Sequence, residues 1–195
     1  MFYQSIEQFN SVNKYVKKIM QHNQRRVSIP YELTCKIHGT NAGIRITSQG
    51  EVTVLSRKNV ITTEQDNYGF AKFVEYFKPN SGEVYIYGEW FGTGIQKGVA
   101  VCEVDKAFAI FEIKIPDDLT ENFRRVSWKD SIWQHLSGAV EDMLGSPAVT
   151  KLNDRRIYFI QQFYLEHLVL DFGDPVAIAQ QIEKIVSTVK QIEEN

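Results

Sequence analysis

The feature that most constrains the fold is a change in the spacing of apolar residues near residue 31. Before it, apolar side chains recur every three or four residues, as in a helix packed against a core. After it, short segments alternate apolar and polar residues and are rich in β-branched and aromatic types, as in half-buried strands. These segments are YELTCKI, AGIRIT, EVTVLSR, GEVYIYGEW and KAFAIFEIKI, all within residues 31–115. A run of strands with helices before and after it predicts an α+β protein.

The connections between the segments support this prediction. Residues 48–51 (SQGE) have the composition of a hairpin turn. Residues 62–78 carry an apolar face and predict a short crossover helix, after which 80–82 (NSG) return the chain to a strand. We therefore expect a β core over residues 31–115, preceded by a helical segment over 1–30.

The remainder of the chain, residues 116–195, is expected to be mostly helical. Residues 127–144 are one amphipathic helix candidate, and residues 158–172 fit either a helix or a strand. The last helix has a good N-cap in Asp174 and a proline at its first position. Its apolar stripe fits packing on the chain's own core or a coiled-coil seam. We predict a single domain over 1–195.

Composition narrows the functional class of this chain of 195 residues. Its net charge of −2 excludes a globally basic nucleic-acid coat but leaves a local basic groove open. Cys35 and Cys102 form no CxxC pair, as expected of a reduced, cytoplasmic protein. There is no uninterrupted apolar run of membrane-spanning length, so we expect no membrane partner.

The segment most suggestive of chemistry is CKIHGTN, residues 35–41, between two predicted strands. Gly39 permits a tight or left-handed turn that brings the backbone close to a ligand. Thr40 and Asn41 add hydrogen-bonding groups, and the amine of Lys36 is free to point into a site. Taken alone, a lysine in a loop is usually solvated.

This segment resembles the nucleotidyl-transfer signature of the covalent nucleotidyltransferases, which include DNA and RNA ligases and RNA capping enzymes. Its His-Gly-Thr-Asn form is similar to the RNA ligases of phages and to kinetoplastid RNA-editing ligases. Three further family motifs follow in the family's order: LSR at 55–57, YGEWFGTGIQK at 87–97 and FAIFEI at 108–113. Glu112 stands where relatives have aspartate. The resemblance implies the adenylation-domain fold, an antiparallel sheet flanked by helices.

The resemblance also implies a three-step reaction. Lys36 attacks the α-phosphorus of ATP, with Mg²⁺ as the required cofactor, and keeps AMP as a phosphoramidate. AMP then passes to the 5′-phosphate of an RNA end, and a 3′-hydroxyl attacks that activated end. Only a neutral amine is a nucleophile, and an unperturbed lysine with a pKa near 10.4 is almost fully charged at pH 7. The site must therefore favour the neutral form by desolvation or neighbouring cations.

The family match assigns roles to further residues. Glu89 is expected to accept hydrogen bonds from the ribose hydroxyls, and Phe111 to stack on adenine. Taken singly, Glu89 fits a solvent-facing strand residue and Phe111 fits ordinary core. The other expected nucleotide-binding residues are Arg57, Asn41 and His38, while Gln96 and Thr40 are expected to orient groups or contact RNA. No metal ligands are assigned.

The later part of the chain departs from the family pattern. Residues 112–195 contain neither the Glu-Gly strand nor the Lys-x-Lys strand of these ligases. We therefore expect the adenylation domain to be incomplete at its C-terminus, to be inactive or slow alone, and to need a second polypeptide for the missing motifs. A second hypothesis is a non-catalytic or split-subunit nucleic-acid-binding module with a ligase-like half-fold. A DNA ligase or capping enzyme is disfavoured, because those relatives usually have aspartate at the position of His38.

Overall fold

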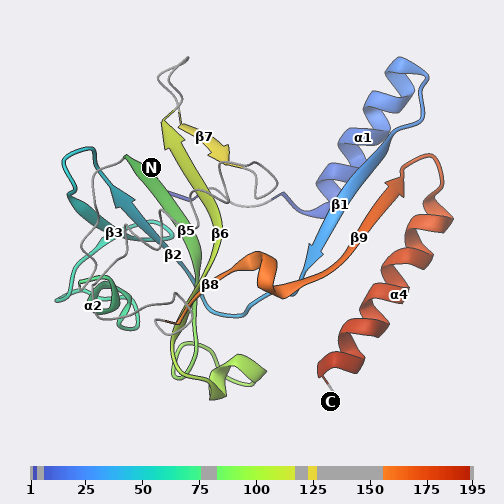
Figure 1. The fold of residues 1–195 in the computed structure, drawn as a ribbon. Coiled ribbons are helices and arrows are strands. Elements are labelled where there is room, and N and C mark those ends of the chain that lie inside the picture. The colour runs from blue at the N-terminus through green and yellow to red at the C-terminus, as the bar shows by residue number, and fades with distance from the viewer. Residues whose placement is uncertain (1, 4–6, 76–82, 117–122, 127–155, 194–195) are drawn as a thin grey trace. The chain divides into compact units, whose positions relative to one another are not determined.

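The structure is a computed structural model of the protein, and its described residues form two compact units (Figure 1). One unit comprises Met1–Tyr3 and Lys36–Gln162, and the other comprises Gln4–Cys35 and Phe163–Asn195. Within these ranges the structure describes residues 2–3, 7–75, 83–116, 123–126 and 156–193. The two units are described separately below.

The first unit is built on a seven-stranded sheet in the order β4-β3-β2-β5-β6-β7, with β8 also paired to β6. Every pair is antiparallel except β6–β8, which is parallel. This arrangement confirms the α+β prediction and the antiparallel core. The strands are β2 (Thr40–Ile46), β3 (Val52–Ser56), β4 (Val60–Ile61), β5 (Val84–Phe91), β6 (Ala107–Pro116), β7 (Phe123–Val126) and β8 (Ile157–Phe159).

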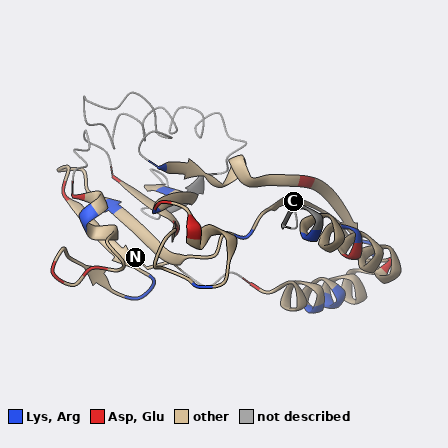
Figure 2. Ribbon diagram, turned by 90° about the horizontal axis from the view of Figure 1, so that it is seen from below, with Lys and Arg blue, Asp and Glu red and all other residues tan. Residues whose placement is uncertain are grey.

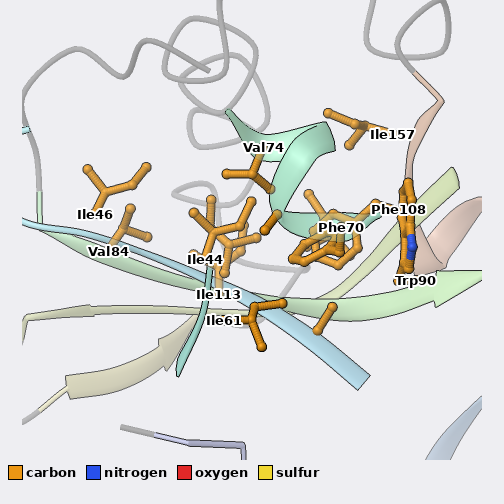
Figure 3. Packing of buried hydrophobic residues seen from close by; sticks show 14 of the residues in the cluster. Ile44, Ile46, Ile61, Phe70, Val74, Val84, Trp90, Phe108, Ile113 and Ile157 are labelled. Carbon is orange, nitrogen blue, oxygen red and sulfur yellow. The ribbon is translucent and has the colours of Figure 1, made fainter. Parts of the chain in front are cut away.

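The main hydrophobic core lies between one face of this sheet and the short helix α2 (Phe70–Val74), as Figure 3 shows. Phe70 is completely buried, and its ring centroid lies 5.3 Å from that of Trp90 and 4.9 Å from that of Phe108. Alternate residues of β2 and β5, such as Ile44 and Ile86, complete this core. Their neighbours in sequence therefore point to the opposite face.

The turn predicted at residues 48–51 is present between β2 and β3. The N–H of Thr47 donates to the carbonyl of Glu51, and Gly50 has a φ of 80°, a left-handed conformation that favours glycine. The crossover helix is shorter than predicted, because the segment before it is a loop whose Asp66 carboxylate accepts hydrogen bonds from the N–H groups of Ala71 and Lys72. The predicted turn at 80–82 and helix at 127–144 lie outside the described residues.

The second unit is an antiparallel pair of strands packed against two helices. β1 (Ser28–Thr34) pairs with β9 (Tyr164–Asp171), and the helices are α1 (Phe9–Asn23) and α4 (Pro175–Glu193). Leu168 and Leu170 are buried among residues of both helices, whereas Val169 between them is half exposed. This alternation explains why the stretch before α4, which fitted helix or strand by sequence, is a strand, reached from β8 through a 3₁₀ turn at Ile160–Phe163.

The two helices differ in charge. The charged residues of α1 are all basic, whereas α4 carries both signs (Figure 2). Asp174 caps α4 as predicted, accepting a hydrogen bond from the N–H of Ala177. Among the apolar residues of α4, Ile178 is buried, but Ile182 is 37% exposed. Among the described residues no helix is long and apolar enough to cross a membrane.

Candidate functional site

The candidate site lies on the sheet face opposite the main core, in the first unit. Asn41 of β2 and Glu89 of β5 are direct cross-strand partners. Since side chains alternate between faces, Glu89 shares its face with Tyr87, and Asn41 lies opposite it on the same face. Tyr87 is buried there against Leu55 and Tyr85, and Phe111 packs on this cluster. The face therefore combines a polar end around Glu89 with an aromatic region beside it.

The loop that carries Lys36 is fixed to this face through Gly39. The backbone N–H of Gly39 donates a 3.0 Å hydrogen bond to Oε1 of Glu89. Its carbonyl oxygen accepts a 2.9 Å hydrogen bond from Nε2 of Gln96. The N–H and the carbonyl of Gly39 are thus each hydrogen-bonded to the side chain of a predicted site residue, Glu89 and Gln96.

Glycine is required at position 39 by space and not by backbone conformation. A Cβ at this position would collide with the carbonyl oxygen of Trp90 and would lie 2.9 Å from Cβ of Phe91. Gly39 is not among the described residues with a positive φ. The close approach expected from the sequence is present, but it is an approach to strand β5, and the alternative of a left-handed turn is wrong.

The charges of the site gather around the half-buried carboxyl of Glu89. Burial raises the pKa of this carboxyl above its ordinary value of 4.5, because the ionised form loses solvation. The N–H of Gly39 and the positive charges of Lys36 and Arg57 act in the opposite direction and partly offset the rise in pKa. Lys36 and Arg57 are themselves exposed. Their charges therefore reach Glu89 while their ends remain accessible to a ligand.

Phe111 occupies a special place in the sheet. Tyr87 pairs with Glu112 and Gly88 pairs with Ile110, so Phe111 is the extra residue of a bulge in β6 and faces no cross-strand partner. Its ring packs against Tyr3, with 4.9 Å between the centroids. The next residue, Glu112, is buried and forms a 3.2 Å ion pair with Lys114. Glu112 is the register partner of Tyr87, so its buried carboxylate lies on the same face of the sheet as Tyr87 and the Phe111 ring.

The remaining predicted residues lie around the same loop. His38 is exposed, two positions after Lys36. Oγ1 of Thr40 accepts a 3.3 Å hydrogen bond from Nδ2 of Asn67, which ties the loop before α2 to the start of β2. Sequence reasoning missed Asn67 and Tyr3. Neither lies in a recognised motif. The fold brings Tyr3 to Phe111 on the site face. Thr40 pairs in register with the core residue Trp90, so its side chain and Asn67 lie toward the core face and not beside Asn41 and Glu89.

A family model described as RNA ligase matches residues 29–191, most of the chain. The chain belongs to the RNA ligase family. The matched region includes every predicted site residue, from Lys36 to Phe111, and extends through β9 into α4. A search of curated proteins gives no significant match. The antiparallel sheet with flanking helices is consistent with a ligase domain of the nucleotidyltransferase type.

The described residues of this RNA ligase family member do not form a dedicated metal centre. No three of their His, Cys, Asp or Glu side chains are grouped as metal ligands. One carboxylate of the site, Glu89, is already engaged by Gly39. What the site offers is a mixed surface of cations, the Glu89 carboxylate and an aromatic ring, which are the groups that a nucleotide needs for its phosphates, ribose and base.

Proposed function

We propose that this RNA ligase family member joins RNA 5′-phosphate and 3′-hydroxyl ends through a lysyl-AMP intermediate on Lys36, with ATP as the adenylate donor. The observation that carries the proposal is the clamp between Glu89 and Gly39. It connects the loop of the nucleophile to the strand of the ribose-reading carboxylate, within range of the Lys36 and Arg57 charges. The motifs alone predict these residues, and the clamp supports a shared site.

The proposed reaction has three steps. The neutral amine of Lys36 attacks the α-phosphorus of ATP, a P–N bond forms, diphosphate leaves, and the amine gives up a proton. An oxygen of the RNA 5′-phosphate then attacks the same phosphorus and forms a P–O bond, the P–N bond breaks, the Lys36 nitrogen takes up a proton and leaves as the free amine, and the RNA end carries AMP. In the last step the 3′-hydroxyl attacks the 5′-phosphorus, loses its proton, and AMP leaves as the phosphodiester bond forms.

The other residues bind and orient the nucleotide. Oε1 of Glu89 holds the Gly39 N–H, so its carboxylate is fixed in place with a second oxygen for a ribose hydroxyl. Phe111 would stack on the adenine ring, an interaction worth roughly 1–3 kcal/mol. Arg57 and Asn41 would hold phosphate or ribose oxygens, Arg57 through its planar fork. Gln96 keeps the loop in register through the Gly39 carbonyl, and His38 and Thr40 are proposed to orient neighbouring groups.

Mg²⁺ is proposed to enter with the triphosphate. Magnesium usually keeps several waters and binds through substrate phosphates with one or two carboxylates, so it needs no all-protein cage. Its chemistry would be to neutralise phosphate charge.

The test is self-adenylylation of the full chain with α-labelled ATP and Mg²⁺. We expect label on the protein that is stable in alkali and released by acid, as a P–N bond requires. Lys36→Ala should abolish it, whereas Lys72→Ala, an exposed lysine of α2 in the same unit, should not. Label that persists in Lys36→Ala would contradict the proposal.

The second candidate is a nucleic-acid-binding or split-subunit module. It is favoured by the lack of the Glu-Gly and Lys-x-Lys motifs in residues 112–195, because the missing cations would promote attack on the α-phosphorus. In that case the chain binds ATP and RNA ends but takes no label alone. Labelling that appears only after a second polypeptide is added would identify a split enzyme.

A further inference from the structure

Tyr3 belongs to the proposed nucleotide site although it lies far from every motif. The tripeptide Met1–Tyr3 is part of the first unit, whereas Gln4–Cys35 belong to the second. The ring of Tyr3 packs on the site face, 4.9 Å from the Phe111 centroid and 5.2 Å from the Tyr87 centroid. Tyr3 thus lies beside the expected base-stacking ring.

The bulge explains why Phe111 needs such a neighbour. A residue in a regular ladder is held by partners on the adjacent strands, but a bulged residue is not paired and its side chain takes a new direction. Phe111 has no register partner on β5. The angle of its ring is therefore set by side-chain packing, and Tyr3 is tilted at 58° to it, a usual angle for two aromatic rings in contact.

We propose that Tyr3 is a positioning residue of the nucleotide site, which holds the Phe111 ring at the angle at which it stacks on a purine base. The inference rests on the proposed function, since it takes Phe111 as the base-binding residue. It adds a specific expectation: Tyr3 acts on the base of the nucleotide through Phe111 and not on the sugar or the phosphate. A competing role, in which Tyr3 covers Phe111 and must be displaced by the base, makes the opposite prediction for affinity.

The test measures equilibrium binding of AMP, which cannot be transferred to Lys36 because it has no diphosphate to release. We expect Tyr3→Ala to weaken AMP binding roughly 2- to 10-fold, the range for loss of one aromatic pair. Tyr3→Phe should restore it, because the ring is retained. Phe2→Ala is the matched control, since it removes the adjacent ring, which is 44% exposed. It should leave affinity unchanged.

Two measurements separate positioning from general damage. Ribose 5-phosphate has no base, so its weaker binding should be the same in the wild type and Tyr3→Ala. In a Phe111→Ala background, Tyr3→Ala should have no further effect on AMP affinity. An equal loss for ribose 5-phosphate, a loss that persists without Phe111, or tighter AMP binding in Tyr3→Ala would each overturn the inference. Labelling of Lys36 tests the proposed function separately, and either can fail without the other.

Discussion

The N–H of Gly39 and Oε1 of Glu89 lie 3.0 Å apart, although fifty positions separate these residues in the chain. This hydrogen bond connects the loop after β1 to strand β5. It makes the position of Lys36 depend on a carboxylate that we also propose as a nucleotide ligand. Loss of Glu89 should therefore affect both the nucleotide and the nucleophile.

Substitution of Glu89 distinguishes these two roles. Glu89→Ala removes the acceptor of the Gly39 N–H and the carboxylate for ribose, whereas Glu89→Gln retains an acceptor oxygen. We expect self-adenylylation to fall roughly 10- to 100-fold in Glu89→Ala, the effect of losing a hydrogen bond to a charged group. The loss should be smaller in Glu89→Gln. Equal rates for the two variants would show that the Gly39 hydrogen bond does not matter.

Removing the charge of Glu89 should raise the thermal stability of the protein, although it lowers the rate of self-adenylylation. The pKa of this carboxyl is raised in the folded protein, so the folded state binds the proton more tightly than the unfolded state does. The contribution of this proton to folding stability is therefore complete below the ordinary pKa of 4.5 and is lost as pH rises through the raised pKa of the folded state. Glu89→Gln carries no charge to desolvate, so we expect its Tm to exceed that of the wild type at pH 7. The difference should vanish below about pH 4.5. Thermal unfolding between pH 4 and pH 8 measures it, and a less stable Glu89→Gln at pH 7 would contradict the burial argument.

Gly39→Ala should disrupt the loop by steric conflict. Since the new Cβ would meet the Trp90 carbonyl, β2 and β5 or the loop must move, and overpacking of this kind typically costs about 1–3 kcal/mol. We expect a lower free energy of unfolding in denaturant and a loss of self-adenylylation. A variant as stable and as active as the wild type would mean that the contact relaxes without consequence.

Gln96→Ala tests the second side-chain hydrogen bond of Gly39, the one to its carbonyl oxygen. Gln96 is exposed, and its amide donates to the Gly39 carbonyl, so a net change in unfolding free energy of about 1 kcal/mol or less is expected. The rate of lysyl-AMP formation should fall several-fold, because the loop carrying Lys36 is less restrained. Lys97→Ala, the exposed neighbour, serves as the control. A fall in stability without a fall in rate would assign Gln96 a structural role only.

The core offers a prediction independent of function. Phe70 is fully buried between Trp90 and Phe108, and Phe70→Ala should lower the free energy of unfolding by about 3–5 kcal/mol. Val60→Ala in β4, at a side chain 56% exposed, should change it by less than about 0.5 kcal/mol. Chemical denaturation followed by intrinsic fluorescence provides the measurement, and similar values for both variants would contradict the described core.

Much of the sheet was predictable because its residues alternate. The strands over residues 40–46, 52–56, 84–91 and 107–116 lie within two residues of the predicted segments. The turn before β3 was readable from its glycine. The strand β9 was not decided by sequence, because Leu168, Val169 and Leu170 form a short apolar run that fits either period.

The site was predictable only as a set of motifs. Sequence order could not show that Glu89 and Gln96 meet on Gly39, because that requires the register of β2 against β5. Nor could it bring Tyr3 to Phe111, since a single aromatic residue near the start of a chain carries no periodic signal. The bulge that frees Phe111 likewise appears only when the two strands are paired.

The pairing of β1 with β9 bears on how the protein forms during synthesis. Ser28 is matched to Asp171, so β1 cannot pair until the much later residues of β9 have been synthesised. Translation at roughly 5–20 residues per second gives the intervening sheet time to collapse first. The loop of Lys36, which directly follows β1, would thus be restrained on its β1 side only after β9 has been made, so the proposed nucleophile would reach its final surroundings after the sheet has formed.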